Sequence, residues 1–473
     1  MNDAIVVGSG PNGLAAAVEL ARNGLDVTVL EAEDEIGGGT RSGEITVPGV
    51  LHDLCSGVHP MAIASPYLKT LGLERYGLEW AFPEIDLAHP LDSGDPGVMV
   101  RSLTGTAALL GSDGSAWSRL FGPLSAGFDE LAEELMAPLL HLPRHPVHLA
   151  RFGTRALLPA TLLARRLRTP QARALFGGVA AHHYAPLTGP GSAAIGTMMI
   201  AAGHRVGWPV PRGGSRAIPA ALAALLTELG GKIETGVRVE SLAELRPAPT
   251  IILDLAPGAV ARIAGDALPA QVRRAYTRYR HGPGAYKIDL AVQGGVPWRD
   301  EACRRAGTLH LGGSFEEIVA VERQTWRGGM PKRPYVLVAQ QYLADPSRSA
   351  GDIHPVYAYA HVPHGYTGDA TEAILAQLER FAPGTRDRIV GMATRSPAGF
   401  EAHNANYVGG DIITGANTLG QILFRPRPAL DPYSTGIPGV FVCSAATPPG
   451  AGVHGMGGYH AARSALRQAR HGR

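Results

Sequence analysis

The chain begins with a glycine-rich turn between an apolar run and a helical segment. Residues 5–7 are Ile-Val-Val, which is typical of a buried parallel strand, and Gly8, Gly10 and Gly13 follow at G-x-G-x-x-G spacing around Pro11 and Asn12. The first glycine permits the tight turn, the second lets the backbone approach a pyrophosphate, and the third brings helix and strand close together. The unpaired N–H groups at the start of the helix favour a diphosphate. The spacing predicts a dinucleotide cradle, and a glycine-rich turn in another α/β unit is the alternative.

An acidic residue closes the second strand. Glu31 follows Gly13 by eighteen positions and precedes Ala32. A carboxylate at this place accepts hydrogen bonds from ribose hydroxyls and repels a 2′-phosphate. The acid therefore favours FAD or NAD over NADP.

The residues after Glu31 distinguish between these two dinucleotides. Gly38, Gly39, Thr40 and Arg41 form a run that resembles the E-x(5)-G-G-x-x-[RST] segment of flavoproteins such as glutathione reductase, amine oxidases and phytoene desaturases. In those families this segment continues the cradle under the flavin's diphosphate. The resemblance implies non-covalently bound FAD, with Arg41 near the diphosphate or the flavin, where a guanidinium fork suits anionic oxygens. A solvated loop arginine is the alternative.

Composition excludes several other classes of function. Lys and Arg number 43 against 41 Asp and Glu, and this balance offers no electrostatic basis for binding nucleic acid. The three cysteines lie far apart without a C-x-x-C pair, so neither a disulfide framework nor a zinc ribbon is expected. His182 and His183 are adjacent, and neighbouring side chains diverge, so we expect a loop or cavity wall there and no metal.

The chain has no evident targeting segment. It lacks a basic n-region and a long apolar stretch, so we expect a cytoplasmic protein. Residues 145–168 mix leucines with arginines, which favours either peripheral contact with a membrane surface or a solvated basic face on a packed helix. No pattern in the sequence predicts an oligomeric state.

The order of the patterns predicts two interleaved domains in 473 residues. We assign residues 1–60, 205–265 and 405–473 to a discontinuous FAD-binding domain, and residues 61–204 and 266–404 to a substrate-binding domain. The first contains strands near 232–235, 237–240 and 250–255. The second contains a helical insertion, with helix-period segments at 127–140 and 145–168. It also contains strands at 286–292, 308–311, 335–342 and 356–362, with helices at 314–326 and 369–381. The fold class is α/β, a Rossmann-like domain of the glutathione reductase type with an α+β substrate domain around a mixed sheet.

A second G-x-G-x-x-G occurs near the end of the chain. Gly450, Gly452 and Gly455 follow the strand at 437–443 and Ser444, but two prolines intervene and the chain stops before another Rossmann unit. We interpret the segment as a glycine-lined loop that leads into a helix at Gly455 and Met456. Its N–H groups are expected to hold the flavin's pyrimidine edge.

The chain as a whole resembles the phytoene desaturase-like flavoproteins. The cradle, the segment 210–215 (Val-Pro-Arg-Gly-Gly-Ser) and the closing segment 443–462 carry this likeness. The segment 401–411 resembles the phytoene dehydrogenase-related branch. The resemblance implies FAD, a separate substrate domain and redox chemistry on carbon–carbon or carbon–nitrogen bonds. It also places Val239 where the backbone meets the adenine.

Three residues are candidates for catalysis. The stretch around Lys287 is similar to the amine-oxidase stretch whose lysine holds a water beside flavin N5, although Lys287 and Asp289 could instead form a buried pair on one strand face. His59 and His454 are the other polar residues expected near the flavin ring, and a purely structural role is the alternative for His59.

These patterns predict an FAD-dependent dehydrogenase, desaturase or oxidase that transfers a hydride from an apolar substrate to flavin N5. Electrons would then pass to oxygen or a quinone, because no second nicotinamide cradle is visible. A flavin-dependent isomerase or saturase is the main alternative. Amine oxidation comes second because no aromatic cage is recognisable, and a non-catalytic flavoprotein comes last.

Overall fold

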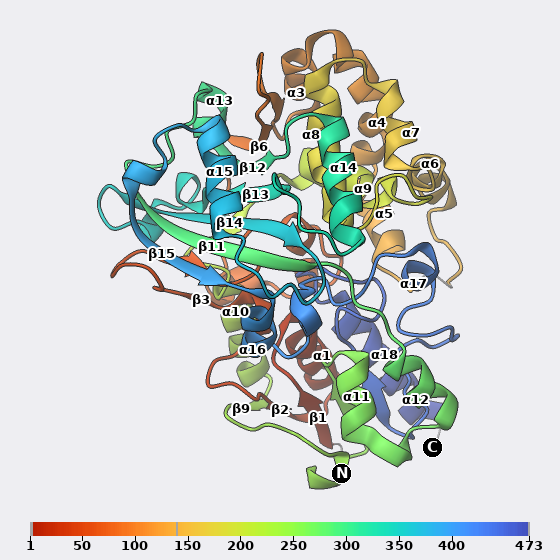
Figure 1. Cartoon of the computed structure of the whole chain (residues 1–473). Helices are drawn as coiled ribbons and strands as arrows, with labels where there is room; N and C mark the ends of the chain where they lie inside the picture. Colours follow the sequence, from red (N-terminus) through yellow and green to blue (C-terminus); the bar gives the residue numbers. More distant parts are fainter. Residues whose placement is uncertain (1–2, 139–140, 472–473) are drawn as a thin grey trace.

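The computed structural model describes residues 3–138 and 141–471, and two large sheets organise them (Figure 1). The first sheet is parallel and has the order β16-β10-β1-β2-β9. Its strands are β1 (Asp3–Val7), β2 (Asp26–Leu30), β9 (Lys232–Glu234), β10 (Thr250–Leu253) and β16 (Val440–Val442). β1 lies between β2 and β10, and the carboxyl ends of all three strands meet there. In open α/β sheets, this is the edge where ligands bind.

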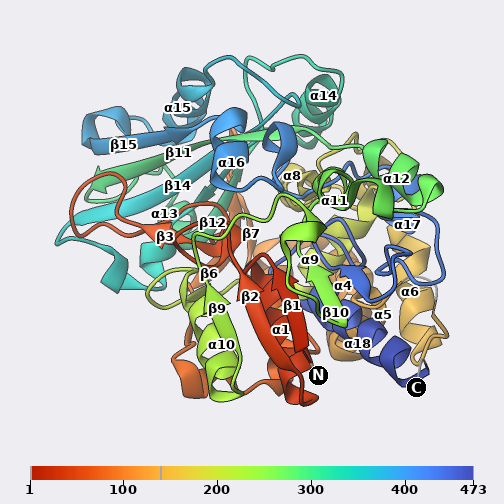
Figure 2. The same cartoon turned by 90° about the horizontal axis from the view of Figure 1, so that it is seen from below.

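Helices cover both faces of the parallel sheet. α1 (Pro11–Arg22), α10 (Ala217–Glu228) and α18 (Met456–His471) lie in a row on one face (Figure 2). α11 (Pro257–Ala264) and α12 (Ala270–Thr277) cover the other face. Side chains alternate along a strand, so Val6 packs into the first layer and Val7 into the second.

The first and last helices of the described chain are in backbone contact. A Cβ atom added to Gly458 on α18 would lie 1.8 Å from the carbonyl oxygen of Asn12 and 2.8 Å from the backbone nitrogen of Ala16. Glycine is therefore the only residue that permits this approach. The contact brings the end of the chain beside the dinucleotide cradle.

The second sheet is mixed, as predicted, with the order β15-β11-β14-β13-β12-β6-β7. Only the β12–β6 pair is parallel. The strands are β6 (Ile85–His89), β7 (Gly97–Met99), β11 (Gly284–Gln293), β12 (Ala306–Leu311), β13 (Val336–Ala339), β14 (Ile353–Val362) and β15 (Ile389–Arg395). α15 (Thr371–Phe381) packs on one face, while α13 (Glu301–Arg305) and α16 (Pro397–His403) lie at its margins.

A helical layer covers the other face of this sheet (Figure 1). It consists of α3 (Leu103–Leu109), α4 (Gly114–Ala126), α5 (Phe128–Leu135), α6 (Pro146–Ala156), α7 (Ala160–Leu163), α8 (Pro170–Ala180), α9 (Ala193–Val206) and α14 (Phe315–Trp326). Short elements complete the fold: α2 (Pro60–Ile63), α17 (Leu419–Leu423), and the strand pairs β3 (Ser42–Gly43) with β4 (His52–Asp53) and β5 (Trp80–Ala81) with β8 (Val210–Pro211).

The structure corrects several element predictions. Residues 61–204 are not purely helical, since β6 and β7 extend the second sheet. All five residues of β6 are buried, and the strand pairs with β12, which lies far along the chain. Residues 237–240 form no strand, and the strand predicted at 335–342 stops at Ala339. The helix predicted at 127–140 ends at Leu135, and residues 139–140 lie outside the described residues. The segment 145–168 is broken into α6, α7 and a short 3₁₀ turn.

None of the helices in the described ranges is long and apolar enough to cross a membrane. Nor do three or more His, Cys, Asp or Glu side chains within residues 3–138 and 141–471 come together as metal ligands.

Candidate functional site

A single cavity of about 760 Å³ extends from the edge of the parallel sheet to the face of the mixed sheet. Its first wall is the predicted cradle. Eleven of the predicted cofactor residues line this wall: Gly8, Gly10, Pro11, Asn12, Glu31, Ala32, Gly38, Gly39, Thr40, Arg41 and Val239. Residues predicted from the glycine spacing and residues predicted from the family resemblance therefore lie around one space.

The glycines of this wall are required by close contacts. Gly8 has a φ of +99°, which side chains rarely adopt. A Cβ on Gly10 would lie 2.7 Å from Asp254 Oδ2, and one on Gly39 would lie 2.0 Å from the hydroxyl oxygen of Tyr407. Gly38 approaches Gly10 closely enough that its Cβ would lie 3.3 Å from the Gly10 Cα. The bare backbone left by these glycines fits a diphosphate against the start of α1.

Glu31 is held in one orientation at the edge of the cradle. Its Oε2 accepts hydrogen bonds from the Ser9 N–H at 2.8 Å and the Ser9 hydroxyl at 2.5 Å, while its Oε1 accepts one from the Glu33 N–H at 3.0 Å. Each carboxylate oxygen has more than one acceptor site, so Oε1 keeps capacity for a ribose hydroxyl. At Val239, neither the N–H nor the C=O bonds to another group within residues 3–138 and 141–471. This free backbone fits the edge of an adenine.

Arg41 lies beside the glycine turn and forms no ion pair with the residues that the structure describes. Its Nε donates to the Gly38 carbonyl at 3.0 Å, and its Nη2 donates to the His403 carbonyl. Both acceptors are neutral, and the side chain is buried against the cavity. Thr40 is turned away, because its hydroxyl donates to the Gly37 carbonyl at 2.7 Å. The guanidinium of Arg41 therefore fits an anionic ligand at the cradle.

Five of the predicted site residues are not part of the cavity wall: Gly13, Ser444, Gly455, Met456 and Lys287. The Gly13 N–H instead donates to Asp254 Oδ2 at 2.9 Å, and the Met456 N–H donates to His454 Nδ1 at 3.1 Å. The Ser444 hydroxyl accepts from the Ala446 N–H at 3.3 Å. In the closing loop, the wall is formed by Ala445 and residues 449–454.

Lys287 lies behind the cavity wall on β11. Its ammonium forms an ion pair with both carboxylate oxygens of Asp289 and lies 4.3 Å from the centre of the Tyr357 ring. Both members of the pair are buried. Burial lowers the pKa of Lys287, with Asp289 opposing the shift, and the same ion pair holds the pKa of Asp289 below its usual value. The buried pair considered in the sequence is present, and contact of Lys287 with a flavin stays a prediction.

His59 lines the cavity as a neutral imidazole. Burial lowers its pKa to about 4. Its Nε2 lies 2.8 Å from the hydroxyl of Ser215, which itself donates to the Ser56 carbonyl at 2.7 Å. Because that hydroxyl has one proton and donates it to Ser56, His59 Nε2 must carry the proton in the His59–Ser215 bond. Nδ1 of His59 is then an acceptor of low basicity.

His454 also lines the cavity, but its ring supports the closing loop. Its Nδ1 accepts from the Met456 N–H at the start of α18, and its carbonyl accepts from the Ser65 hydroxyl at 2.7 Å. Burial lowers its pKa to about 4. The imidazole is therefore neutral and occupied with backbone groups.

Asp254, which follows β10 and meets the glycine turn, was not among the residues predicted from the sequence. It accepts the Gly13 N–H described above, and burial raises its pKa to about 7, with the charge of Glu31 acting in the same direction. A polar residue directly after a strand of a parallel sheet is the signal that could have identified it.

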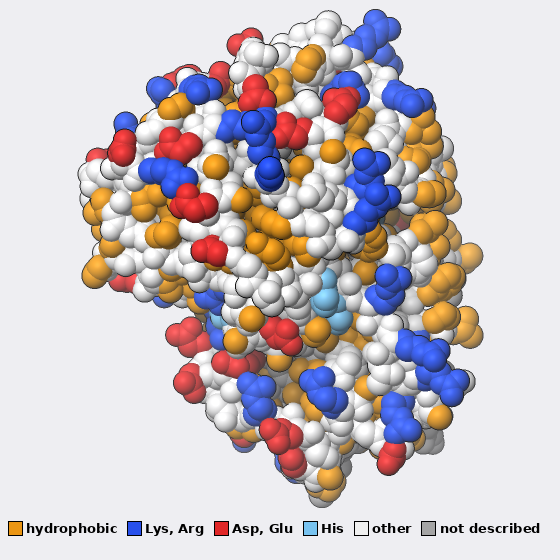
Figure 3. Space-filling view, viewed as in Figure 1, with side chains coloured by type: hydrophobic (Ala, Val, Ile, Leu, Met, Phe, Trp, Pro, Cys, Tyr) orange, Lys and Arg blue, Asp and Glu red, His pale blue; other side chains and the backbone are white. Residues whose placement is uncertain are grey.

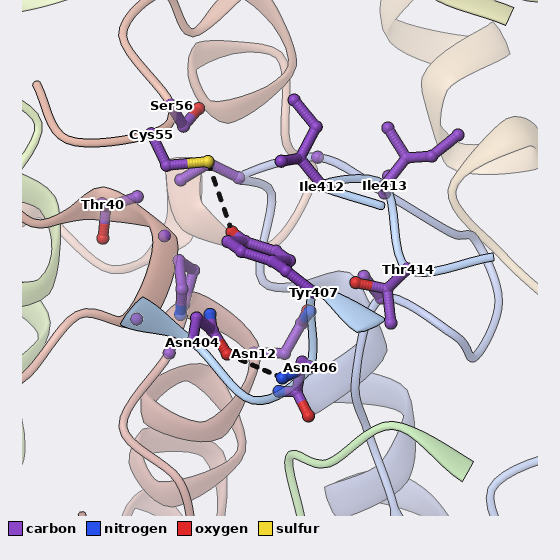
Figure 4. A pocket seen from close by; sticks show the side chains of 18 of the residues that line it. Asn12, Thr40, Cys55, Ser56, Asn404, Asn406, Tyr407, Ile412, Ile413 and Thr414 are labelled. Atoms are coloured by element: carbon purple, nitrogen blue, oxygen red, sulfur yellow. Dashed lines mark hydrogen bonds between the residues drawn. The ribbon is translucent and has the colours of Figure 1, made fainter. Parts of the chain in front are cut away.

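Asn404, Asn406 and Tyr407 form a second group that was not predicted as part of the site. Their segment had been used only as evidence of a family resemblance. The Tyr407 hydroxyl points toward the sulfur of Cys55 at 3.6 Å, and Asn404 Oδ1 accepts the Asn406 N–H at 3.1 Å (Figure 4). The side chain of Asn406 bridges the Ala256 N–H and the Asp254 carbonyl. These contacts attach the segment to the edge of the parallel sheet.

The opposite wall of the cavity is largely apolar. It draws on α9, α17 and the loop before it, and β12 to β14. The residues are Ala194, Ile195, Met198, Met199, Trp208, Thr308, Leu337, Tyr357, Tyr359, Ile412, Ile413 and Ile422, together with His182, whose pKa burial lowers to about 4. Aromatic rings line the cavity, although no aromatic cage was recognisable in the sequence. The arrangement places an apolar chamber next to a dinucleotide cradle.

Comparison with known proteins supports this fold. The family described as "NAD(P)-binding Rossmann-like domain" matches residues 6–70. A Rattus norvegicus protein, "Pyridine nucleotide-disulfide oxidoreductase domain-containing protein 2", is 25% identical over 562 residues that cover 98% of this chain and 93% of the relative.

Solved structures share the whole architecture. A triple mutant of putrescine oxidase has a TM-score of 0.63 at 18% identity and covers 99% of both chains. A fatty acid isomerase from P. acnes, which produces CLA, has a TM-score of 0.58 at 14% identity and covers 98% of both chains. The predicted fold class is confirmed, as an α/β oxidoreductase fold with a Rossmann-like domain. Cradle and fold together support FAD as the cofactor.

Proposed function

We propose that the protein is an FAD-dependent dehydrogenase or oxidase that acts on an apolar organic substrate. The supporting observation is the continuity of the cavity, in which the cradle and the apolar wall enclose one space. FAD, when bound, supplies a two-electron acceptor that takes a hydride at N5. The apolar wall holds the substrate carbon against it and excludes water. The likeness of residues 401–411 to phytoene dehydrogenase-related proteins supports a carbon–carbon bond as the site of reaction.

The charges that line the cavity favour a neutral reacting group. Its four acids, Glu31, Glu33, Glu240 and Asp254, all belong to the cradle side. The face of Tyr357 already holds the Lys287 ammonium, which would repel a second cation. The positive charge of a protonated amine substrate would therefore have no carboxylate partner among the described residues of the apolar wall.

Amine oxidation is nevertheless the second candidate, because Tyr357, Tyr359, Trp208 and Tyr407 line the cavity. The rings of Tyr357 and Tyr359 lie 5.8 Å apart and are nearly perpendicular. Putrescine oxidase shares the fold, and a fatty acid isomerase shares it as well. An isomerase would use the same chamber without net electron transfer.

Anaerobic mixing distinguishes these reactions. Purified protein should be yellow, and its flavin should bleach with unsaturated or saturated apolar substrates. Readmission of oxygen, or addition of a quinone, should restore the colour and identify the electron acceptor. Bleaching by primary amines alone would favour the second candidate, and turnover with the flavin still oxidised would favour an isomerase. A flavin-free, colourless preparation would overturn all three.

We further propose that the apolar substrate is drawn from a membrane surface. Residues 141–168 and 412–430 contain no Asp or Glu, and they carry Arg144, Arg151 and Arg165 beside exposed Leu157 and other apolar residues: Val147, Leu162, Leu419, Leu423 and Phe424. Both segments lie against Gly191, since a Cβ on Gly191 would lie 3.4 Å from Leu419 and the Gly191 N–H donates to the Leu157 carbonyl. Hydrophobic and basic side chains gather along this edge, over α6 and α17 (Figure 3). Such a surface complements anionic lipid.

Vesicle binding tests the membrane contact. The protein should sediment with vesicles that contain phosphatidylglycerol and less with pure phosphatidylcholine. The double variant Leu157→Ser and Leu423→Ser should reduce binding several-fold, because it removes apolar contact from both segments. Val390→Ser with Met392→Ser, which removes exposed apolar side chains on β15, is the matched control and should bind normally. Equal binding of both double variants would contradict the proposal.

A further inference from the structure

Arg425 is a buried cation beside the closing loop, next to Ala445 and Gly450. It lines the cavity, and about 5% of its surface is exposed. Its Nη2 donates to the side-chain oxygen of Asn417 at 2.8 Å, and its Nη1 lies 3.5 Å from the Ala445 carbonyl. Its Nε has no hydrogen-bond partner. A guanidinium has five N–H donors, so most of its capacity is unused by the described residues.

No carboxylate compensates this charge. Arg425 takes part in none of the ion pairs formed within residues 3–138 and 141–471, whereas the buried Arg348 is paired with both Asp53 and Asp345. The acceptors that Arg425 does have, an amide and a carbonyl, are neutral. A buried charge without a counter-charge is costly, and such a group is retained where a ligand supplies the missing partner.

The FAD diphosphate is not the natural partner of this guanidinium. Arg41 already stands beside Gly38 at the cradle and is the cation that fits the diphosphate. Arg425 instead approaches the closing loop, where a Cβ on Gly450 would lie 2.8 Å from its Nη1. Its hydrogen-bond partner Asn417 lines the same cavity, whose wall also includes the apolar residues Ile412, Ile413 and Ile422.

We propose that Arg425, with Asn417, binds the carboxylate of an amphiphilic substrate whose hydrocarbon part fills the apolar chamber. The planar fork of a guanidinium matches a carboxylate in two parallel hydrogen bonds. Asn417 is fixed for this role, because its Nδ2 donates to the His183 carbonyl at 3.0 Å while its Oδ1 orients the guanidinium. The inference rests on the proposed function only in treating the chamber as the substrate site.

A pairwise comparison of ligands tests the carboxylate site. FAD-loaded protein is titrated with oleate, oleyl alcohol and methyl oleate below their micellar concentrations, and binding is followed by calorimetry and by the visible spectrum of the flavin. We expect oleate to bind at least about tenfold more tightly than the alcohol or the ester, because only the acid supplies the missing charge. Equal affinities, or no binding of oleate below about 1 mM, would overturn the inference.

Variants then assign the preference to Arg425. In Arg425→Gln, the affinity for oleate should fall to about that for oleyl alcohol, while the affinity for the alcohol is unchanged. Arg425→Lys should keep part of the preference for oleate. Arg427→Gln is the matched control, since this arginine lies on the same loop, outside the cavity wall, and donates to the Ser434 carbonyl. FAD content and Tm report whether each variant is folded. If a variant does not fold, the comparison of oleate with the alcohol and the ester on the wild-type protein still tests the inference.

Two outcomes separate this inference from its rivals. A shift in the flavin's reduction potential in Arg425→Gln, with the preference for oleate retained, would assign Arg425 to the flavin and overturn the carboxylate site. Absence of flavin bleaching by any substrate would contradict the proposed function, while the binding comparison would still decide the role of Arg425.

Discussion

At the scale of single residues, Asp254 places a carboxylate where a diphosphate is expected. It lies beside Gly8 and Gly10, and its side chain receives the Gly13 N–H that the helix would otherwise offer to an anion. Burial raises its pKa to about 7. Near neutral pH the folded protein therefore holds a proton that the unfolded chain has released.

This difference predicts a pH-dependent stability. The carboxyl pKa rises from 3.8 to about 7 on folding, so its contribution to stability falls as pH rises from about 4 to about 7 and is level above that. Asp254→Asn removes the titration, so the Tm of the variant minus that of the wild-type apoprotein should increase between pH 5 and pH 8. Scanning calorimetry measures this difference.

The control for this experiment is Asp387→Asn, which changes an exposed aspartate and should show no trend with pH. FAD affinity gives a second readout, since loss of the charge should tighten FAD binding at pH 8. A Tm difference that is constant across this range would contradict the role assigned to Asp254.

The buried pair of Lys287 and Asp289 predicts a large stability effect. Lys287→Met should lower the free energy of unfolding by about 3–5 kcal/mol, because it leaves the Asp289 carboxylate buried without its partner. The double variant Lys287→Met with Asp289→Leu should recover most of this loss. Urea unfolding measures both values.

An unchanged rate of flavin reoxidation by oxygen in the double variant would show that the pair is structural, and a slower rate would favour the flavin-side role predicted from the sequence.

At the scale of elements, the packing of α1 on α18 depends on a missing side chain. Gly458→Ala should destabilise the protein by about 1–3 kcal/mol, because the added Cβ meets the backbone of Asn12 and Ala16, which cannot move without displacing the cradle. FAD should also bind more weakly. The measurements are chemical denaturation and flavin fluorescence.

Gly153→Ala on α6 is the control for this substitution. Its Cβ would meet nothing within 4 Å, so helix propensity should make the change neutral or stabilising by up to about 1 kcal/mol. If the two alanine variants had equal stability, the α1–α18 contact would not be the constraint described here.

At the scale of the whole molecule, the cavity joins segments from both ends and from the middle of the chain. Its wall includes Val7 of the parallel sheet, Tyr357 of the mixed sheet, and Val239, Arg425 and His454 from loops. A ligand that fills this space contacts the folded state only. Binding of FAD should therefore stabilise the complete molecule.

The expected stabilisation follows mass action. Free FAD at a hundredfold excess over its Kd should add about 2.7 kcal/mol to the free energy of unfolding, and each further tenfold excess about 1.4 kcal/mol. Thermal melts of apoprotein across a series of FAD concentrations measure the increment. NADP should give no comparable shift, because Glu31 stands where its 2′-phosphate would lie. A Tm independent of FAD would contradict the cofactor assignment.

The sequence alone determined the features that depend on short spacing. The cradle glycines and Glu31 lie within one strand, turn, helix and strand, where geometry follows from the local backbone. The strands of the mixed sheet that alternate in polarity were also recognised. β6 was missed because it is a short strand whose partner, β12, lies far along the chain, and β15 because it is an edge strand with a glycine at Gly391.

Only the tertiary structure decided which other side chains reach the cavity. Tyr407 and Arg425 lie in loops without a regular pattern, and Asp254 follows a strand whose neighbours in the sheet come from distant parts of the chain. Long-range packing placed Lys287 behind Tyr357 with Asp289 as its partner. The spacing of the two residues along the strand had left open whether Lys287 pairs with Asp289 or faces the flavin. Local sequence determines backbone geometry over a few residues, whereas contacts between distant segments determine which charges are paired and which face the ligand.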